Sequence, residues 1–201
     1  MHILLKDLLK EEEEKSALQV QLYVDMDGVL VDMDAGFKEL SDGLAPREYE
    51  EKNGKSSFWK LIASKPNFWI DLKPMPDAKQ LWDVIKANFK NPPPVILSAG
   101  QGSSIVQQKT AWIRKHIDPT VKVIIASAGS KKPEYILKTP GRVTHVLLDD
   151  TGPRDVEDDK QDNITAWNNV ALHRIAIHHT DAASSIKQLQ TFIELQTFIN
   201  E

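Results

Sequence analysis

The stretch QLYVDMDGVLVD, residues 21–32, decides the fold. Its apolar residues 22–24 are typical of a buried strand. Asp25 and Asp27 follow at a spacing of two, which places both side chains on one side of an extended chain. Gly28 then permits a sharp turn, because glycine adopts backbone angles that other residues avoid. Open α/β sheets bind their ligands where strands end, so the pattern predicts a site there.

The two carboxylates of this stretch favour a divalent cation. Like charges held close together are unfavourable unless a cation or a proton lies between them, and oxygen ligands suit a hard ion such as Mg²⁺. An ordinary acidic turn is an alternative, since Asp-Gly is a common turn pair. An EF-hand loop is a poorer one, because Val29 stands where the third ligand belongs.

Composition limits the class of protein. The chain has 201 residues, of which 41% are hydrophobic, and this is enough for one domain with a small insert. The formal net charge of -4 argues against binding of long nucleic acid. Without cysteine, disulfides and thiolate chemistry are excluded. No apolar run approaches a membrane helix and no signal peptide is evident, so we expect a cytoplasmic protein that does not bind membranes.

The rest of the chain alternates short apolar strands with amphipathic helices. This order predicts an α/β fold with a mostly parallel five-stranded sheet flanked by helices. Further strands are expected at 95–97, 121–125, 143–148 and 171–177, with helices at 2–15, 77–90, 103–116, from Pro133, and around 186–193, and with Asp77 and either Ser103 or Ser104 as helix caps. Residues 34–76 interrupt the alternation, so we expect a core of residues 1–33 and 77–201 and a small insert between them.

Polar groups follow four of the expected strands. They are Asp25 with Asp27, Ser98, Lys132 and the pair Asp149-Asp150. The carboxyl ends of parallel strands share one edge of a sheet, so these groups can converge there. Each one alone has an ordinary explanation, as a turn residue, a residue at a helix start or a surface lysine. Their common position after a strand favours a single site.

These four segments, in this order, resemble the motifs of the haloacid dehalogenase superfamily of phosphatases. The resemblance implies a Rossmann-like core and hydrolysis of a phosphate ester through an aspartyl-phosphate. It assigns the nucleophile to Asp25 and the acid and base to Asp27. Ser98, the amide of Ala99, and Lys132 in preference to Lys131 would bind the phosphoryl oxygens. The implied ligands of Mg²⁺ are Asp25, the backbone carbonyl of Asp27, and Asp149, with Asp150 acting through water.

Two further segments are similar to the 5'(3')-deoxyribonucleotidases within that superfamily. They are PNFWIDLKPMPDA, residues 66–78, and QKTAWI, residues 108–113, in which Lys109 is expected near the phosphate. In that family a small helical cap, inserted after the first strand, holds the base of a nucleoside monophosphate between aromatic rings. The positions in this chain nearest to those rings are Met33, Trp59, Phe68 and Trp69.

Alternatives remain open at this point. The same chemistry could serve a sugar phosphate or a polynucleotide end, or the fold could belong to a non-catalytic nucleotide-binding protein. The sequence departs from the nucleotidase pattern at Met33, at Asp77 and in the segment after Ser98, which affects base and sugar preference more than the chemistry. A homodimer is one assembly that the sequence leaves open.

Overall fold

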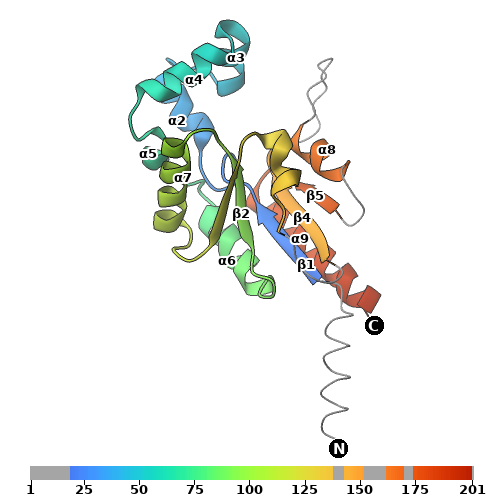
Figure 1. The fold of residues 1–201 in the computed structure, drawn as a ribbon. Helices are drawn as coiled ribbons and strands as arrows, with labels where there is room; N and C mark the ends of the chain where they lie inside the picture. The colour runs from blue at the N-terminus through green and yellow to red at the C-terminus, as the bar shows by residue number, and fades with distance from the viewer. Residues whose placement is uncertain (1–18, 138–142, 152–161, 170–173, 201) are drawn as a thin grey trace, which may run out of the picture.

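A five-stranded sheet forms the centre of the molecule. The structure is a computed structural model, and it describes residues 19–137, 143–151, 162–169 and 174–200. Every pairing in the sheet is parallel, which confirms the predicted α/β class, and the spatial order is β3-β2-β1-β4-β5 (Figure 1). The strands are β1 (Gln19–Val24), β2 (Val95–Ala99), β3 (Lys122–Ala126), β4 (Val143–Asp149) and β5 (Arg174–His178). The predicted helix at 2–15 and the first residues of the predicted fifth strand lie outside the described residues.

The two faces of the sheet are covered by different helices. Side chains alternate along β1, so Leu22 and Val24 join one apolar cluster and Tyr23 joins another. Helices α6 (Ala78–Asn88), α7 (Ser103–His116) and α9 (Ala182–Asn200) supply residues to the first cluster. The short α8 (Asn163–Asn168) and a 3₁₀ helix, η1 (Gly129–Tyr135), supply residues to the second. Among the described helices, none has the length and apolar character needed to cross a membrane.

Four short helices lie between β1 and α6. They are α2 (Met33–Leu40), α3 (Pro46–Asn53), α4 (Lys55–Ser64) and α5 (Phe68–Asp71). Figure 1 shows α2, α3 and α4 beyond the end of the sheet at which β1 finishes. The two ends of this segment lie side by side, since Val31 pairs with Pro74 and the Met75 amide donates to the Leu30 carbonyl at 2.9 Å. Residues 34–76, the predicted helical insert, therefore begin and end at one place in the fold.

The insert shares its apolar cluster with the core. Phe37 stacks on Phe58 within it, with ring centroids 4.8 Å apart. At the boundary, the Trp112 indole of α7 donates to the Leu72 carbonyl at 2.8 Å, and Trp69 is buried against the same helix. The division of the chain into core and insert stays a prediction.

Two predicted helices start where expected but lack the predicted side-chain cap, and a third starts earlier than expected. Gly102 precedes α7 with a φ of 90°, so Ser103 and Ser104 lie inside the first turn instead of capping it. The helix predicted to start at Pro133 starts at Gly129 as a 3₁₀ helix. Asp77 precedes α6, but its carboxylate accepts from the Ala182 amide at 3.1 Å. Asp77 therefore occupies the N-cap position of α6, and its carboxylate binds the first amide of α9, which is distant in sequence and adjacent in space.

Candidate active site

A lysine joins two of the predicted carboxylates at the carboxyl edge of the sheet. The Lys132 ammonium lies 2.7 Å from an oxygen of Asp25 and 2.5 Å from one of Asp149. Asp25 follows β1, Asp149 ends β4, and Lys132 comes from η1 after β3, so three segments meet here as the parallel topology requires. All three side chains are buried. Lys131 instead pairs with Glu134 in an exposed position, so Lys132 is the lysine of this cluster.

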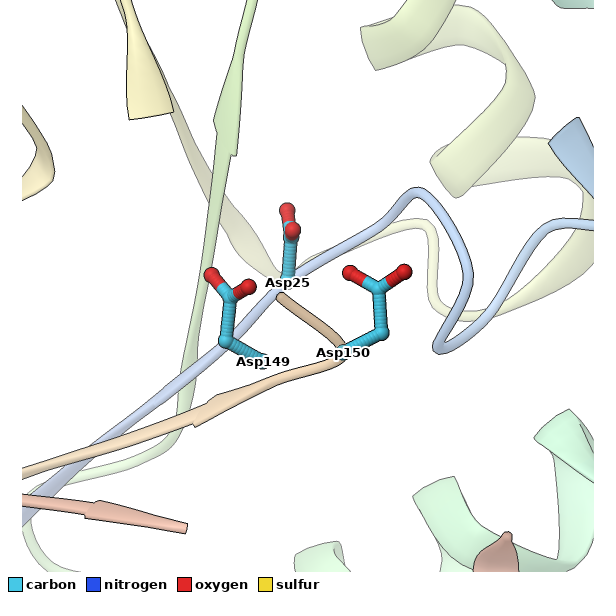
Figure 2. Close-up of side chains that lie close together, drawn as sticks. All are labelled: Asp25, Asp149 and Asp150. Atoms are coloured by element: carbon cyan, nitrogen blue, oxygen red, sulfur yellow. The ribbon is translucent and has the colours of Figure 1, made fainter. Parts of the chain in front are cut away.

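Three carboxylates form a group that could hold a cation. Asp25, Asp149 and Asp150 each offer one oxygen, and these oxygens lie within 4.8 Å of one another. Figure 2 shows the three side chains projecting on the same side of the strand ends. A set of carboxylate oxygens at this spacing fits a hard divalent ion such as Mg²⁺. Asp150 thus lies with the other two carboxylates, and its predicted action through water stays a prediction.

Burial and charge act in opposite directions on this cluster. The pKa of Asp25 is raised well above its ordinary value, and burial is the largest cause. The charge of Lys132 lowers this pKa, whereas the charges of Asp149 and Asp27 raise it further. Burial also acts to raise the pKa of Asp149, but the charge and hydrogen bond of Lys132 outweigh it, so that pKa is lowered. The two carboxylates keep the pKa of Lys132 above its ordinary value despite burial. Lys132 therefore stays charged.

Asp150 has a surplus of negative charge around it. The residue keeps solvent-exposed surface, yet many protein atoms surround its carboxyl group. This burial, and then the charge of Asp149, raise the pKa of Asp150 to about 7. A divalent cation among the three carboxylates would relieve that repulsion, which is a second indication that the group suits a metal.

The second carboxylate of the first motif points to another lysine. An oxygen of Asp27 pairs with the ammonium of Lys109, a residue of α7 that is fully buried. The same ammonium donates to the Ser98 hydroxyl oxygen at 3.1 Å and to the Ala99 carbonyl at 2.7 Å. The Ser98 hydroxyl proton remains available for donation, since its oxygen is the atom that accepts. Asp27, Ser98 and Ala99 therefore adjoin one another beside the acidic group.

The four predicted base-binding residues occupy different environments. Phe68 and Trp69 of α5 are buried, with 1% and 2% of their surface exposed. Trp59 of α4 is 40% exposed, and Met33 at the start of α2 is half-buried. Trp59 is therefore the ring among the four with a free face, and the base-binding role of all four stays a prediction.

Sequence reasoning missed the partner that orients Asp149. The Asn163 amide, at the start of α8, donates to both Asp149 oxygens at 3.1 and 3.2 Å. The Thr151 amide donates to one of them at 2.9 Å. In the sequence, Asn163 belongs only to a glycosylation-like triplet, Asn-Ile-Thr, and no other signal marks it.

Comparison with known structures assigns the fold. It is that of haloacid dehalogenase-like hydrolases. One such hydrolase, from Burkholderia xenovorans LB400, gives a TM-score of 0.50 at 14% identity over 80% of this chain and 82% of that one. A second, from Xanthomonas campestris, gives a TM-score of 0.50 at 8% identity over 90% of this chain and 99% of that one. At these identities the likeness is one of fold.

Searches by sequence give no match. No protein-family model matches the chain, and no curated protein is significantly similar to it.

Proposed function

We propose that the protein is a Mg²⁺-dependent phosphomonoesterase that hydrolyses nucleoside monophosphates through an aspartyl-phosphate. The observation that carries this proposal is the bridge from Lys132 to both Asp25 and Asp149, at a sheet edge that also holds Asp27 and Ser98. Phosphoryl transfer needs a nucleophile, neutralisation of phosphoryl charge and a proton for the leaving oxygen. The cluster offers a side chain for each.

The chemistry takes place in two steps. An oxygen of Asp25 forms a bond to phosphorus while the ester P–O bond breaks, and the Asp27 carboxyl gives its proton to the leaving alkoxide. Water then attacks the phosphorus, Asp27 takes a proton from that water, and the bond from Asp25 to phosphorus breaks to release phosphate. Lys132 and the Ser98 hydroxyl stabilise the phosphoryl oxygens throughout.

The residues that would hold Mg²⁺ are Asp25, Asp149 and the Asp27 carbonyl, as the sequence predicted, and Asp150, whose carboxylate lies with those of Asp25 and Asp149. The ion, when bound, neutralises charge on the phosphoryl group. The lowered pKa of Asp149 keeps that ligand ionised, and the Asn163 and Thr151 hydrogen bonds fix its direction.

The substrate class rests on the resemblance of residues 66–78 to the deoxyribonucleotidases and on the aromatic insert. Trp59 offers an exposed ring, and any aromatic face stacks on a nucleobase with about 1–3 kcal/mol. The test is a panel of ribonucleoside and deoxyribonucleoside monophosphates, sugar phosphates and 5'-phosphorylated oligonucleotides with Mg²⁺. Phosphate release from the monophosphates is expected. Turnover confined to the other esters would refute the substrate, and no release from any ester would refute the chemistry.

Asp25 provides the test of mechanism. Asp25→Asn should abolish turnover, and beryllium fluoride with Mg²⁺ should inhibit the wild type by imitating the phosphorylated carboxylate. A variant that still hydrolyses its substrate would place the nucleophile elsewhere.

A further inference from the structure

Lys109 connects three parts of the chain at one ammonium group. It lies on α7, and its Nζ contacts the Asp27 carboxylate after β1, the Ser98 hydroxyl and the Ala99 carbonyl on β2. The same atom lies 4.0 Å from the centroid of the Trp69 indole, on α5 of the insert. The side chain of Lys109 is 1% exposed. The protein thus surrounds this buried positive charge with acceptors and an aromatic ring from three separate segments.

The donors of Lys109 are fully used by the protein. An ammonium group has three N–H donors, and the carboxylate, the hydroxyl and the carbonyl accept all three. The Trp69 face adds a cation–π contact. In this arrangement Lys109 has no donor left for a phosphate oxygen, and its predicted place near the phosphate stays a prediction. Its charge acts on Asp27 instead.

The pairing leaves the two oxygens of Asp27 in different situations. Oδ2 is held by Lys109. Oδ1 is buried and has no hydrogen-bond partner among the described residues. A buried acceptor without a partner costs free energy, so the structure retains an oxygen that is ready for an incoming group. The lysine thereby leaves Oδ1 as the oxygen of Asp27 that has no partner within the described residues.

We propose that Lys109 is a positioning residue that fixes Asp27 for proton transfer and couples it to Trp69 of the insert. The inference rests on the proposed function. With Oδ2 bound to the ammonium, Oδ1 is the oxygen left to pass a proton to the leaving oxygen as the ester P–O bond breaks and the bond from Asp25 to phosphorus forms. Trp69 contacts the same ammonium, so the position of this ring bears on the support of the acid.

The experiment uses aryl phosphates whose leaving groups differ in acidity. A weakly acidic phenol needs a proton as it leaves, whereas a dinitrophenol does not. General acid catalysis is worth about 100-fold or more. We expect Lys109→Met to lower kcat by about 100-fold on phenyl phosphate and by less than about 5-fold on 2,4-dinitrophenyl phosphate. Lys109→Arg, which keeps the charge, should recover part of the loss on phenyl phosphate.

The controls separate positioning from folding. Lys86→Met removes a different lysine with an aspartate partner, Asp118, away from the site, and should leave the dependence on leaving group unchanged. If Lys109→Met does not fold, Lys109→Gln, which keeps donors without charge, replaces it. An equal loss of kcat on both esters in the Lys109 variants would overturn this inference and leave the proposed function standing. A wild type inactive on every ester would overturn the proposed function and, with it, the role in proton transfer.

Discussion

The carboxyl group of Asp150 fills the space that a side chain at Gly28 would need. A Cβ built on Gly28 would lie 2.1 Å from an oxygen of Asp150, far inside contact distance. Gly28 also has a φ of 74°, which other residues adopt at a cost. The turn after β1 therefore determines how closely the first motif approaches the last.

Gly28→Ala should displace Asp150 and disrupt the three-carboxylate group. We expect Mg²⁺ affinity to fall at least about 10-fold, as when groups that orient a metal ligand are lost, with backbone strain of about 1 kcal/mol. Isothermal titration with Mg²⁺ and thermal denaturation measure the two effects. Gly54→Ala is the matched control, because Gly54 has a φ of 80° and no atom within 4 Å of its built Cβ. Equal Mg²⁺ affinity in the two variants would contradict the close approach.

Lys132 is the buried cation that pairs with two carboxylates, so its removal should destabilise the folded chain strongly. Lys132→Met leaves Asp25 and Asp149 unpaired, and we expect a loss of about 3–5 kcal/mol in the free energy of unfolding. A divalent cation that binds the same carboxylates should restore part of this loss. Urea denaturation with and without Mg²⁺ measures both the loss of stability and its recovery.

The neighbouring lysine is the control for that variant. Lys131→Met removes a residue of the same type from an exposed pair with Glu134, and should change stability little. Comparable losses at the two positions would show that the buried pairing of Lys132 is not what stabilises this loop.

The alternation of residues 22–24 and the polar groups after four strands could be predicted because strand period and parallel topology fix them locally. The hydrogen bonds from Asn163 to Asp149 and the contact of Lys109 with Trp69 could not. The pairs Phe58-Trp59 and Phe68-Trp69 look alike in sequence, but Trp69 packs against α7 while Trp59 stays exposed. Only the docking of α5 on α7 distinguishes them, and it also brings Lys109 to Trp69.

Asn163 should control the orientation of Asp149. Its amide donates to both oxygens of that carboxylate, so Asn163→Ala leaves Asp149 to Lys132 and Thr151. We expect about 10-fold weaker Mg²⁺ binding, the lower end of the effect of such partners. Asn168→Ala, on the same helix, removes an amide that accepts from the Ala176 backbone and should leave Mg²⁺ binding unchanged. Titration calorimetry that finds the same affinity in both variants would assign Asn163 a purely structural place.

Asp118 lies just before β3, at the end of the sheet opposite to the site. We expect this residue to make the free energy of unfolding depend on pH. Burial acts to raise its pKa, but hydrogen bonds from Lys86 at 2.5 Å and from the Thr120 amide and hydroxyl at 2.8 and 2.7 Å outweigh it, so the pKa lies well below its ordinary value. A carboxyl with a lower pKa in the folded chain contributes stability above the unfolded pKa of about 4, and loses it as the pH falls toward the folded value. Asp118→Asn should therefore lower the free energy of unfolding by about 1–2 kcal/mol at pH 7, and the difference from the wild type should shrink below about pH 4.

Asp83→Asn is the control, because it breaks the exposed pair with Lys79 and should lower the free energy of unfolding by no more than about 0.5 kcal/mol. Urea denaturation of the three proteins across this range measures it, and a difference for Asp118→Asn that stays constant down to pH 3 would contradict the lowered pKa.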